Sequence, residues 1–324
     1  MVPSPLPVEA AETLPGRPPL LCIVGPTASG KSALALTLAE RWGAEIISLD
    51  ASQVYQRMDI GTAKVSVEEQ ARVKHHLLDC VAPDESFTAA DFCARAEPLI
   101  ERLYEGGQRV ILCGGTGFYL KALLYGLWDA PPADPTISAE LGARRAREGA
   151  AALHRELAEL DPESAARLHP NDGYRIERAL GFFLTHQRSI SAARASHQRR
   201  SRYPHLILGL DPPREVLNAR IEQRVHEMIR AGLFEEVEGL QRSGYQASLK
   251  SMGAIGYRLA LSHLEGAISQ ADFVEQTAAA TRQYARRQRR YFNRQLSTHW
   301  LAPPVDDALL KESLISLWGL DGAP

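Results

Sequence analysis

The sequence has few cysteines, and none of them lie close together. The four are Cys22, Cys80, Cys93 and Cys113, and no two of them form a Cys-x-x-Cys pair. This spacing excludes a zinc ribbon and argues against a disulfide framework, because both need clustered or regularly paired cysteines. We therefore expect reduced thiols, most of them buried in the folded protein.

Long apolar runs and a strong net charge are also missing. No apolar run approaches the roughly 18 residues that a membrane span needs. The proline-rich start has no basic region followed by an apolar one, as a secretory signal would. We therefore expect a cytoplasmic protein and a disordered tail over residues 1–18. The formal net charge is −2, so nucleic-acid binding would depend on a local cluster of positive charge.

The first half of the chain alternates between strand-like and helix-like segments. Leu20–Val24 is a short apolar run between Pro18-Pro19 and Gly25-Pro26, which is typical of a buried parallel strand. Similar patterns predict strands over Glu45–Leu49 and Arg109–Cys113, and helices over Ser32–Trp42 and Ala89–Tyr104. Strands that alternate with helices indicate an α/β fold with a parallel sheet and right-handed crossovers.

The pattern changes after Trp128. Breaker residues over 130–135 are followed by roughly 65 residues with helix and loop signals, including helix starts at Asp161-Pro162 and Asn171-Asp172. His205–Leu210 then predicts a returning strand, followed by a long helix up to Gly232. We expect an α/β core of residues 19–129 and 200–324, with C-terminal helices, interrupted by a helical insertion at 130–199.

A phosphate-binding motif follows the first predicted strand. Its residues, Gly25, Pro26, Thr27, Ala28, Ser29, Gly30, Lys31 and Ser32, fit G-x-x-x-x-G-K-[ST] and open a helix, as a P-loop does. The glycines let backbone N–H groups turn toward an anion, and the helix N-terminus adds a positive partial charge. Lys31 can reach the terminal phosphate, and the Ser32 hydroxyl can bind Mg²⁺. The core is therefore predicted to be a P-loop core.

The acidic residue that accompanies the P-loop is not where a hydrolase needs it. A nucleotide hydrolase usually places a carboxylate at the end of a later strand. Here the strand that ends at Cys113 runs into Gly114-Gly115-Thr116-Gly117, and the acid instead follows the second strand, at Asp50. This pattern favours group transfer from a phosphate ester over hydrolysis.

Asp50 lies at the carboxyl end of a strand, which is where open α/β sheets bind ligands and place catalytic residues. A carboxylate there can accept a proton from an incoming nucleophile. The alternative is a turn cap for Ala51–Val54. Gln53 and Tyr55 add an amide and an aromatic ring, which suit recognition of a base.

Positive charge is concentrated near the C-terminus. Thr281–Arg294 contains six arginines interleaved with aromatic residues, which fits a phosphate-backbone footprint and indicates RNA or another polyanion. The pairs Arg175/Arg178 and Arg220/Arg224, taken separately, are more typical of solvated helix faces than of a functional site. His75-His76 has no evident third ligand, which favours hydrogen bonding over metal binding.

Several of these segments together resemble one family, the bacterial tRNA dimethylallyltransferases, also called tRNA isopentenyltransferases. The matching segments occur in the family's order between about residues 20 and 295, and they are Gly25–Ser32, Asp50–Lys64, His75–Asp79, Gly114–Leu124, His169–Leu180, Gly209–Gly239, Ile255–Arg258 and Thr281–Gln288. Two departures are minor: Ala51 stands where the family commonly has serine, and Tyr291-Phe292 replaces Trp-Phe.

The resemblance implies transfer of dimethylallyl from its diphosphate to N6 of the adenosine 3′ to the tRNA anticodon, with Mg²⁺. It implies catalytic roles for Asp50, Thr27 and Arg220, and diphosphate binding by the P-loop residues and Arg220. The implied tRNA contacts are Asp50, Ala51, Ser52, Gln53, Thr116, Tyr174, Arg175, Ile176, Glu177, Arg178, Gly253, Ala254, Ile255, Gly256, Tyr257 and Arg258. We expect the insertion to bind tRNA, the anticodon stem-loop and dimethylallyl diphosphate to be the partners, and the protein to be a monomer.

Two other functions stay open on the residues alone. A small-molecule kinase with a P-loop and a helical lid would consume ATP and use lid arginines on nucleotide phosphates. A non-catalytic RNA-binding protein could use the P-loop only as an anion site.

Overall fold

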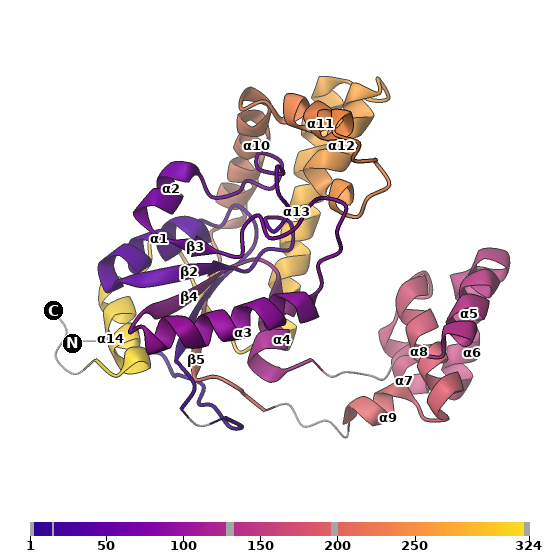
Figure 1. Cartoon of the computed structure of the whole chain (residues 1–324), viewed down its shortest axis with the longest axis horizontal. Coiled ribbons are helices and arrows are strands. Elements are labelled where there is room, and N and C mark those ends of the chain that lie inside the picture. The colour runs from indigo at the N-terminus through magenta and orange to yellow at the C-terminus, as the bar shows by residue number, and fades with distance from the viewer. Residues whose placement is uncertain (1–2, 15, 128–132, 196–199, 321–324) are drawn as a thin grey trace. The chain divides into compact units, whose positions relative to one another are not determined.

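The computed structural model describes residues 3–14, 16–127, 133–195 and 200–320. The chain divides into two compact units, one formed by Met1–Gly126 with Arg200–Pro324 and the other by Leu127–Arg199. The larger unit contains the sheet and the smaller unit is helical (Figure 1). Among the described residues, no helix is long and apolar enough to cross a membrane.

The larger unit is built on a parallel six-stranded sheet with the order β3-β2-β4-β1-β5-β6. Its strands are β1 (Leu20–Val24), β2 (Ala44–Ser48), β3 (His75–His76), β4 (Arg109–Gly114), β5 (His205–Leu210) and β6 (His299–Leu301). β1 is central, with Leu20 opposite both Val110 and His205. The α/β fold and the four predicted strands are confirmed, except that β2 begins and ends one residue earlier and β4 ends one residue later.

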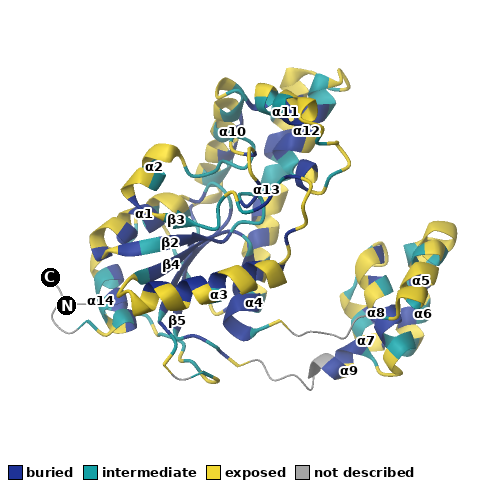
Figure 2. Cartoon of the chain, in the orientation of Figure 1, coloured by how far each residue is buried: buried dark blue, intermediate teal, exposed yellow. Residues whose placement is uncertain are grey.

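Alternating side chains of β1 separate the core into two layers. Leu20, Cys22 and Val24 pack with α3 (Ala89–Glu105) and α4 (Gly117–Tyr125), and Leu21 and Ile23 pack with α1 (Lys31–Trp42) and α14 (Asp307–Trp318). All five residues are fully buried, as expected for a strand covered on both faces. Figure 2 shows the central strands as buried.

The remaining helices of this unit follow β2 or β5. They are α2 (Val67–Arg72), α10 (Arg214–Arg230), α11 (Leu233–Arg242), α12 (Ile255–Leu264) and α13 (Gln270–Gln295). α10 follows Asp211-Pro212-Pro213, as predicted, and Gly232 separates it from α11 in a left-handed conformation. α13 starts at a capping box formed by Ser269 and Asp272.

The smaller unit consists of α5 (Pro135–Glu148), α6 (Ala150–Leu160), α7 (Pro162–Arg167), α8 (Gly173–His186) and α9 (Ile190–Ala195). Its core includes Leu141, Leu153, Leu157 and Leu180. Asp161 caps α7 and Asp172 caps α8, which confirms both predicted helix starts. Asp161 is buried and accepts hydrogen bonds from the backbone N–H and hydroxyl of Ser164 and of Ser191.

The polypeptide leaves and re-enters the larger unit at one place. The backbone N–H of Arg202 donates to the carbonyl of Leu124 at 2.7 Å. The Arg202 guanidinium forms two hydrogen bonds with the Glu97 carboxylate on α3. The two points of the larger unit between which the helical segment is inserted therefore lie side by side.

The N-terminal segment differs from the disordered tail that the sequence predicts. Glu9 and His205 exchange two backbone hydrogen bonds of 2.9 Å, and the backbone N–H of Leu6 donates to the Ser313 hydroxyl. β6 pairs with β5 only from Leu208 onward, which leaves the backbone of His205 open on that side. Glu9 pairs with the backbone N–H and carbonyl of His205 on this side. Without this pairing, buried backbone groups would lack hydrogen-bond partners, at a cost in free energy.

Candidate functional site

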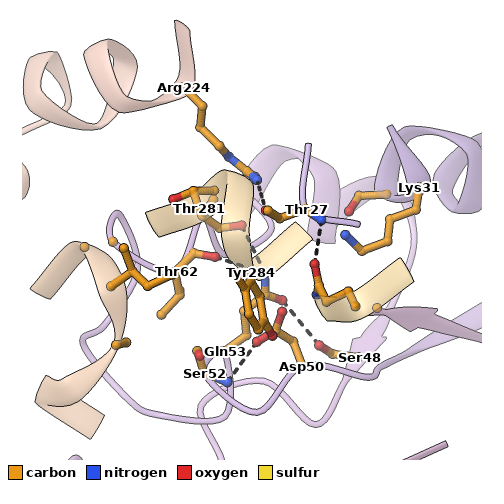
Figure 3. Close-up of a pocket in the computed structure, with 18 of the residues that line it drawn as sticks. Thr27, Lys31, Ser48, Asp50, Ser52, Gln53, Thr62, Arg224, Thr281 and Tyr284 are labelled. Atoms are coloured by element: carbon orange, nitrogen blue, oxygen red, sulfur yellow. Dashed lines mark hydrogen bonds between the residues drawn. The ribbon is translucent and has the colours of Figure 1, made fainter. Parts of the chain in front are cut away.

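A cavity of about 310 Å³ lies in the larger unit where β1, β2 and β4 end. The turns after β1 and β2, the helices α10 and α13, and the loop before α12 all contribute to its lining. Figure 3 shows side chains from these segments converging on it. The sequence predicts chemistry at this edge of the sheet, and the largest set of predicted site residues lies here.

The P-loop forms one end of the cavity. Gly25 has a positive φ, and a Cβ there would lie 2.8 Å from the carbonyl oxygen of Leu210, so glycine is required. Gly30 is left-handed and precedes α1, whose first-turn N–H groups have no partner within the helix. These donors and the helix dipole create a site for an anion.

Lys31 and Ser32 open α1 on the cavity side. Lys31 Nζ donates to the carbonyl of Pro26, which holds the ammonium group beside the loop. Burial lowers the pKa of Lys31 below its usual range, although nearby Asp50 acts in the opposite direction. A bound phosphate would favour the charged form of Lys31, so the site is well suited to a phosphorylated ligand.

Asp50 lies at the cavity, two residues after β2 ends. Its Oδ1 accepts a 2.8 Å hydrogen bond from the backbone N–H of Ser52, so the predicted turn cap does exist. Its Oδ2 makes no hydrogen bond with any of the described residues. One carboxylate oxygen therefore fixes the side chain, and the other can accept a proton or a hydrogen bond from a ligand.

The neighbours of Asp50 hold the turn in place. Thr116 Oγ1 accepts from the backbone N–H of Ala51 at 3.0 Å. The side-chain amide of Gln53 accepts from the Ser48 hydroxyl and donates to the carbonyl of Ala63. Gln53 thus joins the end of β2 to the loop over residues 59–63, so its amide already has partners within the protein.

That loop forms a wall of the cavity through Gly61, Thr62 and Ala63. Glu236 on α11 accepts hydrogen bonds from the backbone N–H groups of residues 59, 60 and 61, and from the Tyr257 hydroxyl. A Cβ on Gly61 would lie 2.4 Å from the Tyr257 ring. The wall is therefore fixed from α11 and α12, which lie far away in sequence.

Two arginines of α10 reach the P-loop at different points. Arg224 lines the cavity, and its Nη1 donates to Thr27 Oγ1 at 3.1 Å. Arg220 lines a separate groove, and its Nη1 donates to the carbonyl of Ser29. Burial lowers the pKa of Arg224, and the nearby Asp50 carboxylate opposes this effect. The family resemblance predicts a role for Arg220, whereas Arg224 is the one of the two that lines the cavity.

The face of α13 that lines the cavity was not predicted. Thr281, Tyr284, Arg287 and Gln288 belong to it. Tyr284 lies near Asp50 (Figure 3), and burial, followed by the charge of Asp50, raises the pKa of Tyr284 to about 12. The arginines of this segment predict only a phosphate-backbone footprint. The i, i+3, i+7 spacing of Thr281, Tyr284 and Gln288 is the signal that could have identified the cavity face.

The segment from Gly253 to Arg258 is divided by the fold. Gly253, Ala254, Ile255 and Gly256 line the cavity. Tyr257 is fully buried and donates to Glu236, so its side chain faces the protein interior, whereas Arg258 is exposed. The predicted tRNA contact of Tyr257 is therefore not available to its side chain in this structure.

The residues from Tyr174 to Arg178 lie at the start of α8 in the smaller unit. Tyr174 is 69% exposed and Ile176 is fully buried in that unit's core. Arg175 pairs with Asp172, and Glu177 pairs with Arg145. Tyr174 therefore presents an accessible aromatic ring on which a base could stack.

The remaining candidate groups are not arranged as a metal centre. His75 Nδ1 lies 2.7 Å from the carbonyl of Val73, and burial lowers the pKa of His75. His76 pairs with Glu45, which agrees with the predicted hydrogen-bonding role. No group of three His, Cys, Asp or Glu side chains in the described parts of the chain could hold a metal ion. All four cysteines are free, and three are buried, as predicted.

Comparison with known proteins gives one consistent result. A family model described as IPP transferase matches residues 53–295. The tRNA dimethylallyltransferase of Geobacter metallireducens is 50% identical over 286 residues, which cover 88% of this chain and 93% of that protein. The Geobacter sulfurreducens tRNA dimethylallyltransferase is 47% identical over 288 residues, which cover 89% and 93%. The solved structure of a tRNA isopentenylpyrophosphate transferase from Bacillus halodurans aligns with a TM-score of 0.68 at 36% identity, and covers 93% of this chain and 96% of that one.

Proposed function

The chain belongs to the IPP transferase family, and on this premise we propose that it transfers dimethylallyl from dimethylallyl diphosphate to N6 of the adenosine 3′ to the tRNA anticodon. The observation that carries the proposal is that the P-loop and Asp50 line the same cavity. One end suits a diphosphate, and the other provides a carboxylate oxygen that can accept a proton. The protein is a transferase rather than a hydrolase or a passive binding protein.

The reaction makes one bond and breaks one bond. The bond between C1 of the prenyl group and the diphosphate oxygen breaks, and its electron pair leaves with diphosphate. A bond forms between C1 and N6 of adenosine, and the N6 proton passes to Oδ2 of Asp50. An aromatic amine is a weak nucleophile, so a carboxylate within hydrogen-bond reach contributes directly to the rate.

The leaving group gains negative charge as the allylic bond breaks. The first-turn N–H groups of α1, the Lys31 ammonium group and the Arg224 guanidinium all lie at that end of the cavity. Thr27 would donate its hydroxyl to the diphosphate while it accepts from Arg224. Donors that are already in position stabilise this charge without reorganising during the reaction. Arg220 supports the loop through Ser29 and completes our proposed diphosphate site.

A divalent ion fits the donor set. Mg²⁺ usually takes one or two protein oxygens together with substrate phosphates, so it needs no preformed protein cage. The Ser32 hydroxyl lines the cavity beside Lys31 and would be its protein ligand. Mg²⁺ would neutralise charge on the diphosphate when it is bound.

The tRNA would be held by several surfaces. The adenosine must leave the anticodon stack to reach Asp50, at a cost of a few kcal/mol. Asp50, Ser52, Gln53 and residues 253 to 256 line the end that would take the base, and Thr116 holds the backbone of Ala51 beside it. The arginines of α13 would contact phosphates. We propose that Tyr174, Arg175 and Arg178 of the smaller unit also contact tRNA. Cytoplasmic location and a monomeric state stay predictions.

The direct test is prenylation by the purified full-length protein. Unmodified tRNA, dimethylallyl diphosphate and Mg²⁺ should give N6-dimethylallyladenosine at one position, identified by nuclease digestion and mass spectrometry. A tRNA in which this adenosine is replaced by guanosine is the matched control and should stay unmodified. Consumption of ATP without prenylation would support a kinase instead.

A further inference from the structure

Gln288 is a buried side-chain amide between the two ends of the cavity. It lies on α13, is 6% exposed and lines the cavity. Its Oε1 accepts a 2.9 Å hydrogen bond from the backbone N–H of Thr27, and its Nε2 donates to the carbonyl of Gly115 at 3.1 Å. The partners fix the orientation of the amide, because Thr27 can only donate there and Gly115 can only accept.

Gly115 lies in close contact with the amide of Gln288. A Cβ on Gly115 would lie 2.0 Å from Nε2 of Gln288, so a larger residue there would displace the amide from its position. Gly115 and Gln288 therefore fit each other as a pair. The close approach brings α13 against the turn that follows β4.

The same turn leads to Asp50. Thr116, which follows Gly115, accepts from the backbone N–H of Ala51 through Oγ1, and its own N–H donates to the carbonyl of Leu49. A continuous series of hydrogen bonds and short backbone segments thus runs from Thr27 through Gln288 to the residues on both sides of Asp50.

We propose that Gln288 is a positioning residue, which sets the distance between the diphosphate site at Thr27 and the proton acceptor at Asp50. This inference rests on the proposed function. In-line transfer requires defined distances between the leaving diphosphate oxygen, the allylic carbon C1 and the N6 atom. A misplacement of about 1 Å can cost on the order of 100-fold in rate. Gln288 holds that spacing before either substrate binds.

The Thr27 contact also shapes the anion site. The backbone N–H of Thr27 points to Gln288, and that of Ser29 donates to the carbonyl of Pro26. The N–H groups offered to an anion are then those at the start of α1. The diphosphate is thus expected at the Gly30–Ser32 part of the loop, and loss of Gln288 would free Thr27 and change the site's shape.

The first experiment compares Gln288→Met with Gln276→Met in the full-length protein. Gln276 is exposed on the same helix, outside the arginine-rich stretch, so it is a matched control. We expect Gln288→Met to weaken binding of inorganic diphosphate with Mg²⁺, measured by calorimetry, by about tenfold, and to slow single-turnover prenyl transfer by about 10- to 100-fold. The affinity for tRNA should change by less than about twofold. Wild-type values for diphosphate affinity and for single turnover would overturn the proposal.

The second experiment uses Gln288→Glu, which keeps the size of the side chain. Ionised, the new carboxylate still accepts from Thr27 but opposes the Gly115 carbonyl; protonated, it donates to Gly115 as the amide does. The ratio of variant to wild-type transfer rate should therefore rise as the pH falls from about 8 to about 6. A ratio that stays constant while the protein remains folded would contradict the positioning role, since a lost packing contact does not recover on protonation.

The outcomes separate this inference from the proposed function. If the wild-type protein binds diphosphate but transfers nothing to tRNA, the proposed function fails. The effect of the Gln288 variants on diphosphate affinity then still supports or overturns the link between Gln288 and the P-loop.

Discussion

Nη1 of Arg224 donates a 3.1 Å hydrogen bond to Oγ1 of Thr27 and so joins two residues that are 197 positions apart. This contact brings a half-buried guanidinium to the P-loop from α10. Arg220, one helical turn earlier, donates instead to the carbonyl of Ser29. The two residues can therefore be distinguished by substitution.

Arg224→Gln should raise the KM for dimethylallyl diphosphate more than Arg220→Gln does. The expected loss in kcat/KM is about 10- to 100-fold for Arg224, because a charge-assisted contact contributes about 1.5–3 kcal/mol. Steady-state kinetics with saturating tRNA measure both values. Equal losses for the two variants would mean that Arg220 contacts the diphosphate directly rather than acting through the loop.

Asp50→Asn should abolish transfer and spare binding. Asparagine keeps the hydrogen bond that Oδ1 accepts from Ser52, but it cannot take the N6 proton. We expect single-turnover rates to fall by about 10²- to 10⁴-fold. Asp84→Asn, on an exposed loop, is the control and should react normally. Normal turnover by the Asp50 variant would remove its assigned role.

Tyr284→Phe should slow transfer without moving the pH profile. The raised pKa of about 12 keeps the Tyr284 hydroxyl protonated at neutral pH, so it can act as a hydrogen-bond donor near Asp50. Loss of one such bond costs about 1 kcal/mol, which is roughly a fivefold decrease in rate. Rates measured between about pH 7 and about pH 10 should show no tyrosine titration in the wild type. An alkaline loss of activity in this range that the Phe variant abolishes would contradict this expectation.

Asp161→Asn should weaken the smaller unit. Burial raises the pKa of Asp161, but the hydrogen bonds from Ser191 and Ser164 outweigh burial and hold its pKa below the ordinary value of 3.8. A lowered folded-state pKa contributes stability above the unfolded-state pKa, and this stability is lost as the pH falls through the folded-state value. The variant should lose about 1–3 kcal/mol at neutral pH and show less acid dependence below about pH 4.

Hydrogen exchange in α7–α9 of the full-length protein, with the exchange of β1 as the internal control, measures this effect. Unchanged protection of α7 and α9 would show that the four hydrogen bonds to Asp161 contribute little.

The central strands could be predicted because they are buried on both faces. β1 and β5 are short apolar runs with clear boundaries. β3 has only two residues, both histidines, and β6 has three that are half-buried, so neither carries an apolar run. Their pairing depends on neighbours that are distant in sequence, and the sequence pattern does not contain that information.

The site was predictable only where its residues directly follow a strand that the sequence itself predicts. The P-loop and Asp50 follow strands directly, so sequence position determines their location. Gln288 and Tyr284 lie on a helix in which arginines dominate the composition, and the packing of α13 decides which face meets the cavity. Arg220 and Arg224 are one turn apart, and only the fold shows which one reaches Thr27.

The hydrogen bond between Leu124 and Arg202 has an evolutionary consequence. It brings together the two points between which the helical segment is inserted, so the register of the sheet does not depend on the length of that segment. Mutations that lengthen, shorten or replace the inserted helices can therefore accumulate while the strands keep their pairing. Substrate recognition could diverge at this position among descendants of one ancestral gene, with the catalytic core inherited unchanged.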